Sequence, residues 1–328
     1  MGGSYPGLGP GPAVETKQRE TLPEYRTGEG IRETIDHGPD HTWCMTRQVQ
    51  GMAVAWRPSI ADLLVSYASS GRLGFTEVVA ENLSVERLPA SLTSLGVPVV
   101  VHGVELGLGG ASEPSAERLT HLAGLAEAID SPFVSEHVAF VRAADSPSHL
   151  HGDVLEAGHL LPPPRTRESL DVLCENVRIA QGALPVPLAL ENIAALFTWP
   201  EDTYTEPDFM TELVERTGVG IVLDVANLYA SASARGTDPA AELRRFPLEA
   251  VAYVHVAGGI ERDGLYLDTH AHPMPPPVLS LLETLVDAYA GRNLPGIMLE
   301  RDGDVSPETV APEFENLARA VDRTASRS

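Results

Sequence analysis

The sequence predicts an α/β protein with the (β/α)8 TIM-barrel fold, and two observations lead to it. Eight short apolar runs recur between residues 52 and 303, mostly continuous rather than alternating, as strands are when both faces of a parallel sheet are buried. Longer amphipathic segments separate these runs. A strand and a helix alternating eight times indicate a barrel, with a doubly wound sheet as the alternative. No GxGxxG opens a helix and no P-loop occurs, which disfavours nucleotide binding.

The eight predicted strands are short and carry few charges before their last residues. They are residues 52–57, 77–80, 99–103, 133–137, 187–193, 220–227, 252–259 and 296–303.

The segments between the strands have apolar residues at helical spacing. The clearest helix begins with Thr205 as cap, has Asp208 in a capping-box-like position and ends at Gly218. The last helix has Ser306 as cap and Pro307 at its first position. The other predicted helices are residues 59–70, 115–129, 166–183, 239–245, 276–290 and 307–323.

The 328-residue chain divides by composition into a tail and one domain. Residues 1–48 are rich in Gly, Pro, Thr and charge and lack periodicity, which predicts a flexible N-terminal tail. Residues 49–325 then form a single TIM-barrel domain. A long insertion at residues 142–165 follows the fourth strand, and at a barrel mouth such a loop is expected to be a lid, a peptide-binding wall or a mobile excursion.

Charge and cysteine content exclude several classes of partner. The formal net charge of −23 repels phosphate backbones, which argues against nucleic acid and anionic membranes. No apolar run is long enough to span a bilayer. The two cysteines, Cys44 and Cys174, form no CxxC pattern, and no secretion signal pattern opens the sequence. These features predict a cytoplasmic protein.

Polar side chains follow six consecutive predicted strands, at the barrel end where chemistry is expected. A charged group at the edge of an apolar strand is costly to desolvate unless it is paired or bound to a cation. A lone example is usually a satisfied structural group, but six strand ends of this kind indicate a metal centre. The residues are His102, Ser135, Glu136, His137, Glu191, Asn192, Asp224, Asn227, His255, Glu300, Arg301 and Asp302.

The stretch 251–273 shows how such an ion would be held. Asp268 and His270 are two residues apart, so in an extended segment they point to the same side. His255 would reach them from the end of the preceding strand. Mixed imidazole, carboxylate and amide ligands without thiolate fit non-heme iron or manganese, and zinc less exclusively. The residues alone leave sugar isomerases, phosphoesterases and oxygenases open.

An ordered set of short motifs adds a family resemblance over residues 50 to 320. The chain resembles the multinuclear non-heme iron-dependent oxidative enzymes (MNIO family), relatives of the methanobactin biosynthesis oxidase. The motifs are ENLS (81–84), VHG (101–103), SEH (135–137), LLPPP (160–164), ENI (191–193), LDVANLYASA (223–232), VHVAG (254–258), DTHAHPM (268–274) and ERD (300–302).

The resemblance implies an activity. Members of the family are TIM barrels with two or three iron ions, and they use dioxygen and a mixed-valent Fe(II)/Fe(III) pair. They modify ribosomally made precursor peptides at Cys, Asp or C-terminal residues, often with a partner protein that binds the leader peptide. The alternatives are a metal-dependent isomerase or hydrolase with zinc or manganese, and a non-catalytic metal-binding or scaffold protein.

The resemblance also implies a ligand set, carried over motif by motif. Glu136, Asp224 and His270 are expected to be catalytic, and Glu136 is the candidate bridge between ions. The implied metal ligands are His102, Glu136, Glu191, Asn192, Asp224, Asn227, His255, Asp268, His270 and Glu300.

Three positions depart from the family pattern. Ile60 stands where the family has a histidine after the first strand, Gly259 stands at the histidine after the seventh strand, and Ala226 replaces an asparagine. The histidine missing at Ile60 helps to hold one iron of three. We therefore expect two iron ions rather than three.

Overall fold

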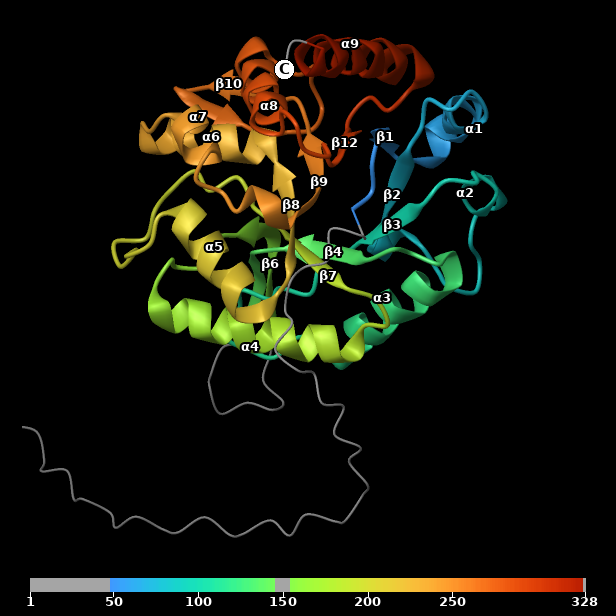
Figure 1. Ribbon diagram of the computed structural model, residues 1–328. Helices are drawn as coiled ribbons and strands as arrows, with labels where there is room; N and C mark the ends of the chain where they lie inside the picture. Colours follow the sequence, from blue (N-terminus) through green and yellow to red (C-terminus); the bar gives the residue numbers. More distant parts are fainter. Residues whose placement is uncertain (1–47, 145–153, 327–328) are drawn as a thin grey trace, which may run out of the picture. The chain divides into compact units, whose positions relative to one another are not determined.

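The eight predicted strands form a closed, all-parallel barrel in a computed structural model that describes residues 48–144 and 154–326. The predicted tail, except its last residue, lies outside the described residues. Closure between the first and last strands confirms the TIM barrel and excludes the doubly wound sheet (Figure 1). Around the barrel the strands are β1 (Met52–Ala55), β2 (Phe75–Val79), β3 (Val99–His102), β4 (Val134–His137), β7 (Leu188–Glu191), β8 (Gly220–Asp224), β9 (Val251–Val256) and β12 (Gly296–Leu299).

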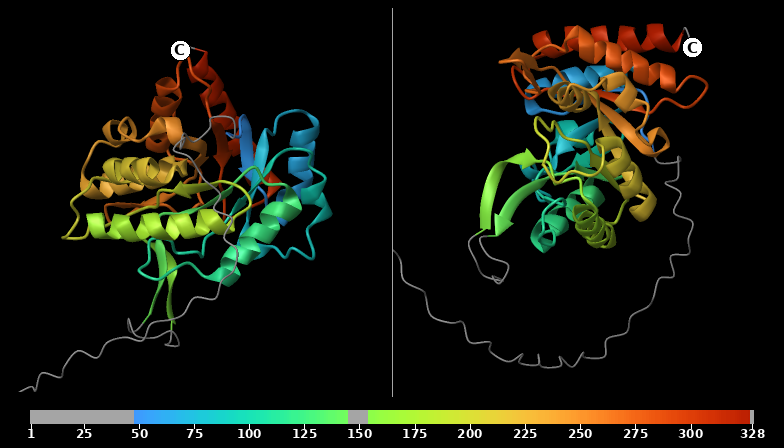
Figure 2. Two further views of the ribbon diagram at one scale, coloured as in Figure 1. Left: turned by 60° about the horizontal axis from the view of Figure 1, so that its bottom comes forward. Right: turned by 90° about the vertical axis from the view of Figure 1, so that its left-hand side faces the viewer.

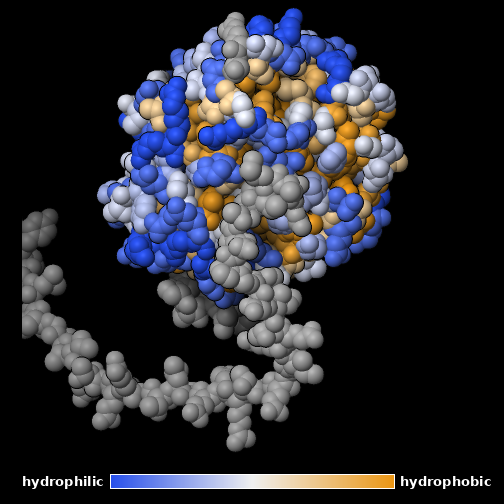
Figure 3. All heavy atoms as spheres, viewed as in Figure 1, coloured by the Kyte–Doolittle hydropathy of each residue, from blue (hydrophilic) through white to orange (hydrophobic). Residues whose placement is uncertain are grey.

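Helices surround the strands. They are α1 (Ala61–Ser69), α2 (Ala90–Thr93), α3 (Ala116–Ile129), α4 (Arg167–Ala183), α5 (Glu206–Thr217), α6 (Val225–Arg235), α7 (Pro239–Leu243), α8 (Pro276–Ala288) and α9 (Pro307–Ala325), with 3-10 turns at Pro58–Ile60, Ala80–Asn82 and Leu248–Ala250. Hydrophilic residues lie mainly over this ring, and hydrophobic residues gather toward its middle (Figure 3). Thr205 caps α5 as predicted, whereas the Ser306 hydroxyl makes no capping bond at α9. None of the described helices is long and apolar enough to cross a membrane.

The alternation of strand side chains positions the site. Outward residues such as Val254 and Val256 pack in the core under the helices. Inward residues near the amino ends form a second apolar cluster, which includes Tyr253. Inward residues near the carboxyl ends are polar, as His255 is on the same strand. Strands β3, β4, β7, β8 and β9 therefore present polar groups to the inside of this end of the barrel, and Glu300 follows β12 directly.

The predicted strand 220–227 is too long. β8 ends at Asp224, and α6 begins at the next residue. The Asp224 side chain caps this helix by accepting a hydrogen bond from the Asn227 amide at 2.6 Å. A strand that enters a helix without a loop gives no turn signal, and α6 was missed for that reason.

Two antiparallel hairpins extend from the carboxyl end of the barrel. The described parts of the 142–165 insertion belong to β5 (Phe140–Ala144) and β6 (Val154–Leu161), which project from the barrel (Figure 2). A second hairpin joins β10 (Ile260–Arg262) to β11 (Leu265–Leu267). Its turn residues Asp263 and Gly264 both have positive φ, as the Asp-Gly signal of a two-residue turn predicts.

Candidate metal centre

Histidine and carboxylate side chains meet inside the carboxyl end of the barrel. They form four overlapping groups whose donor atoms lie within 4.8 Å of one another. Because four residues belong to two groups each, the groups make one continuous array. The groups are His102, His137 and Glu191; Glu191, Asp224, His255 and Glu300; Asp224, Asp268 and His270; and His270, Glu300 and Asp302.

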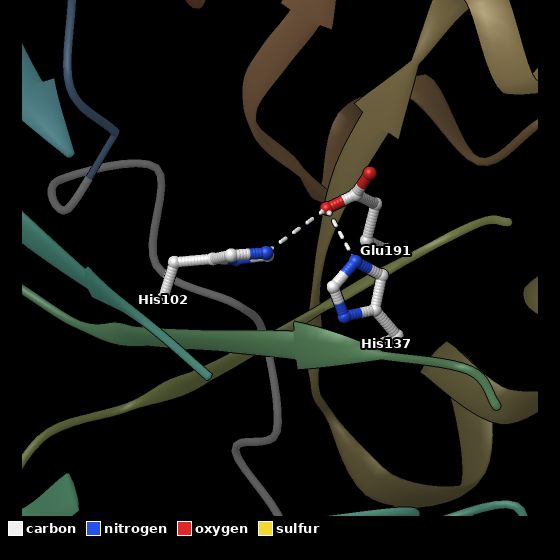
Figure 4. Close-up of side chains that lie close together, drawn as sticks. All are labelled: His102, His137 and Glu191. Carbon is white, nitrogen blue, oxygen red and sulfur yellow. Dashed lines mark ion pairs between the residues drawn. The ribbon is translucent and has the colours of Figure 1, made fainter. Parts of the chain in front are cut away.

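The first group, the deep end of the array, is buried and comes from strands alone. His102 on β3 and His137 on β4 point toward the same oxygen of Glu191 on β7 (Figure 4). The Nε2 atoms of the two histidines lie 3.7 and 3.5 Å from Oε2 of Glu191. Donor atoms that share an ion at about 2.1 Å lie about 3 to 3.5 Å apart, so the spacing suits a shared cation.

The second group continues from the same glutamate. Nδ1 of His255 lies 3.3 Å from Oε2 of Glu191 and 3.1 Å from Oε2 of Glu300. Within the described residues, Nδ1 of His255, Oε2 of Glu191 and Oδ2 of Asp224 are buried without a hydrogen-bond partner. An unsatisfied buried polar atom costs about 1 to 3 kcal/mol. Three such atoms aimed at one space fit a bound cation.

The third and fourth groups form the open end of the array. His270 contacts Asp268 through Nε2, and its Nδ1 lies 3.6 Å from Glu300 and 3.5 Å from Asp302. Arg57 pairs with Asp302 at 2.5 Å. Asp224 ends β8, but Asp268, His270, Glu300 and Asp302 lie outside the strands. His270 has a φ of 50°, a conformation that non-glycine residues rarely adopt.

A cavity of about 740 Å³ reaches both ends of the array. Its walls include His102 and His137 from the deep end and Asp268 and His270 from the open end. The volume is in the range of ligand-binding pockets. A substrate in this cavity would therefore meet the donor groups directly.

The acidic side chains respond differently to burial. Burial raises the pKa of Asp224 well above its usual value, and the nearby charges of Asp268 and Glu191 add to the effect. Burial would also raise the pKa of Glu300, but the neighbouring histidines, first His270, hold it well below the usual range. Burial and the neighbouring carboxylates thus oppose ionisation of Asp224, and a bound cation would relieve this opposition.

The histidine pKa values reflect the same excess of carboxylates. Burial by itself lowers the pKa of His137, but Glu191 and Glu136 outweigh it and raise the pKa to about 9. Burial likewise opposes protonation of His255, yet carboxylates, Glu77 foremost, raise its pKa well above the usual value. Without a metal these imidazoles carry protons that ion binding must displace.

Seven of the ten predicted ligands belong to the groups, and Glu136 does not. Strand alternation turns Ser135 and His137 inward and Glu136 away from the groups. Both Glu136 carboxylate oxygens accept hydrogen bonds from backbone amides, those of Leu106 and His137. Glu136 as bridge stays a prediction, and the structure puts Glu191 in the shared position.

The two predicted amide ligands make structural bonds. Asn192 exchanges two hydrogen bonds, of 2.9 and 3.0 Å, with the backbone of Asp224, joining the loop after β7 to β8. The amide of Asn227 donates to the Asn192 carbonyl at 3.0 Å and toward Glu191 at 3.4 Å. Both residues thereby hold the ligand-bearing segments together.

Three residues near the site were not among the ten predicted ligands. His137 and Asp302 stand inside the SEH and ERD motifs, so the motifs signalled them. Glu77 on β2 is 1% exposed and contacts His255. In the sequence, Glu77 could have been recognised as a charged residue next to the apolar run 78–80.

The three departures from the family pattern are accommodated by packing. A side chain at Gly259 would meet the Leu267 carbonyl oxygen at 2.2 Å, because the β10–β11 hairpin folds back there. Ile60 and Ala226 are buried in the apolar core. None of these positions supplies a metal ligand.

The fold and the donor array define a barrel protein with a candidate multinuclear metal centre. Residues 51–323 match the family described as RiPP precursor modification enzyme MbnB/TglH/ChrH, where RiPP denotes a ribosomally made, post-translationally modified peptide. The chain belongs to this family, which confirms the MNIO resemblance.

Proteins from several bacteria are similar in sequence to this chain. A UPF0276 protein of Streptomyces avermitilis is 51% identical over 85% of this chain, and this chain spans only 56% of that protein. UPF0276 proteins of Caulobacter vibrioides and Rhizorhabdus wittichii are 36% and 35% identical, over 71% and 80% of this chain and 80% and 91% of theirs.

Solved structures share the fold at low identity. Endonuclease IV from Thermus thermophilus matches 83% of this chain and 99% of its own, with a TM-score of 0.54 and 18% identity. The 3-keto-D-glucoside 4-epimerase from E. coli matches 84% and 99%, with a TM-score of 0.53 and 12% identity. These likenesses support the barrel.

Proposed function

We propose that this protein is a non-heme iron enzyme that uses dioxygen to modify a ribosomally made precursor peptide. The modified position is expected at Cys, Asp or C-terminal residues, with a partner protein binding the leader. Membership of a family of RiPP precursor modification enzymes supports the substrate class. The observation that carries the proposal is the set of unpartnered buried donor atoms around Glu191.

The donor chemistry supports iron over a purely structural ion. Imidazole and carboxylate ligands suit iron in either oxidation state, and the described groups contain no thiolate. We propose that the array would hold two ions, one at the deep end, where Glu191 is shared by the first two groups, and one at the open end, where His270 is shared by the other two. Bound iron would supply the redox chemistry needed to activate dioxygen and the substrate.

The side chains of this chain would divide the remaining work. Burial raises the pKa of Asp224, and a bound cation would favour the ionised form of this carboxyl as a ligand. His270, at the cavity wall between Asp268 and Asp302, would hold the more accessible ion near the substrate. Arg57 lines the cavity and neutralises Asp302.

The test is peptide modification under controlled metal and oxygen. Iron-loaded protein is mixed with a precursor peptide encoded beside its gene, and with the neighbouring leader-binding protein if one is encoded. Mass spectrometry then follows the peptide. We expect a mass change that needs both iron and dioxygen and is lost in Glu191→Gln.

Two other results would contradict the proposal. Turnover of a small substrate by zinc- or manganese-loaded protein without dioxygen would favour the isomerase or hydrolase alternative. An unchanged peptide mass and no turnover under any metal would favour a binding or scaffold role.

A further inference from the structure

Three polar side chains lie inside the barrel below the candidate ligands and belong to none of the four groups. They are Glu77 on β2, Ser135 on β4 and Tyr253 on β9, each at most 1% exposed. The rings of Phe75 and Phe133 pack against Tyr253, with centroid distances of 5.7 and 5.5 Å. These polar groups are thus held between the apolar barrel core and the metal centre.

Hydrogen bonds connect them into one chain between two candidate ligands. Oε2 of Glu77 contacts both the hydroxyl of Tyr253 and, at 3.0 Å, Nε2 of His255. The Tyr253 hydroxyl lies 2.8 Å from Oγ of Ser135. Oγ of Ser135 lies 2.9 Å from Nδ1 of His102. The chain therefore runs from His255 through Glu77, Tyr253 and Ser135 to His102.

The carboxylate fixes the direction of every bond in this chain. The Tyr253 hydroxyl donates to Oε2 of Glu77, and the same accepting oxygen lies 3.0 Å from Nε2 of His255, which places a His255 proton on Nε2. Tyr253 has one proton, so its oxygen accepts from Ser135. Ser135 has then used its own proton and accepts from Nδ1–H of His102.

Once each imidazole is neutral, as metal binding requires, this direction leaves its bare nitrogen on the side of the metal centre. His255 keeps its proton on Nε2 and presents Nδ1, which lies 3.3 Å from Glu191. His102 keeps its proton on Nδ1 and presents Nε2, which lies 3.7 Å from the same glutamate oxygen. Glu77 thus selects, in two histidines of different donor groups, the tautomer that can bind a metal ion.

We propose that Glu77 is a positioning residue that sets the tautomers of His255 and His102 through this directed hydrogen-bond chain. The inference rests on the metal centre proposed above, but not on the oxidative reaction. Partners of the second nitrogen of a ligating histidine typically contribute about 10- to 100-fold in metal affinity. Glu77 contacts His255 directly and reaches His102 through Tyr253 and Ser135, whereas Ser135 contacts only His102 of the two histidines.

The test uses full-length protein loaded with Zn²⁺, because zinc is diamagnetic and lets nitrogen NMR of the imidazoles report each tautomer. Zinc affinity is measured in parallel by chelator competition. The variants are Glu77→Gln, Tyr253→Phe and Ser135→Ala. Thr76→Val is the matched control, since it removes a buried hydrogen bond to the Val54 carbonyl from the neighbouring position of β2.

We expect Tyr253→Phe and Ser135→Ala to change the nitrogen signals of His102. Ser135→Ala should leave those of His255 as in the wild type, because Ser135 contacts only His102 of the two histidines. Glu77→Gln should change both histidines and weaken zinc binding about 10- to 100-fold. Thr76→Val should lower stability without changing either tautomer.

Three outcomes would overturn the inference. The first is Tyr253→Phe and Ser135→Ala protein with the His102 signals of the wild type. The second is Glu77→Gln protein with wild-type zinc affinity and tautomers. The third is wild-type protein that binds no zinc, which would remove the metal centre as well and is therefore distinguishable from the other two.

Discussion

The two ends of the donor array are built differently. At the deep end, His102, His137 and Glu191 stand on strands and are buried. At the open end, Asp268, His270 and Asp302 stand on loops, and the Asp302 side chain is 54% exposed. Strands fix a ligand through the barrel's hydrogen bonds, whereas loops can adjust.

Because the two ends are built differently, we expect them to bind metal ions with different affinity and exchange rate. A preformed, desolvated donor set binds an ion tightly because little order is lost on binding. A loop-borne set beside a cavity can change its coordination when substrate arrives. We therefore expect the deep ion to be retained and the open ion to be exchangeable.

Replacing the glutamate shared by the first two groups should have the largest effect. Glu191→Gln removes the charge shared by the first two groups. It should abolish activity and weaken metal binding by more than the about 10- to 100-fold typical of an outer partner. Metal analysis after dialysis checks this prediction. Full metal retention would show that Glu191 is not a metal ligand.

A change confined to the open end should separate the two ions. His270→Ala removes the residue shared by the third and fourth groups, so one ion should be lost and the deep ion kept. His272→Ala is the control, because His272 bonds to Thr269 at 2.8 Å and belongs to no group. Loss of both ions in His270→Ala would contradict the independence of the two ends.

The deep end should bind metal more tightly as pH rises. Opposing burial, Glu191 and Glu136 raise the pKa of His137 to about 9, so below that value a proton competes with the ion. Each unit of pH below about 9 should weaken binding by up to about tenfold for this proton. Titrating zinc affinity from about pH 6 to about pH 9 tests this, and a flat profile would exclude His137 as a ligand.

The smallest effect is expected at Asp302. Its side chain is half exposed and pairs with Arg57 and His270, and exposed ion pairs contribute about 1 kcal/mol or less. Asp302→Asn should change the affinity of the open ion about fivefold or less. A complete loss of that ion in a chelator-competition assay would make Asp302 a ligand of the same rank as His270.

The sequence was sufficient to predict the barrel fold, because strands that are buried on both faces appear in a sequence as short continuous apolar runs. It was less informative on which strand-end residue faces the interior. In the SEH motif, the family resemblance implies Glu136 as a ligand. The two-residue alternation of β4 instead directs the His137 side chain into the site.

Other features depend on geometry that no local pattern carries. Glu77 matters because barrel closure brings β2 opposite β9, and their contact joins residues that are 178 positions apart. The α6 helix was missed because Asp224 ends a strand and caps a helix at once. By contrast, the Asp263-Gly264 pair that joins β10 to β11 is a local signal for a hairpin turn.

The central claim is that this array holds a pair of iron ions. The most direct test is the metal content of anaerobically purified protein, by mass spectrometry, with a Mössbauer spectrum of the iron. We predict two irons per chain, coupled as Fe(II)/Fe(III). Zinc alone, with no iron even after expression in iron-rich medium, would contradict the oxidative account.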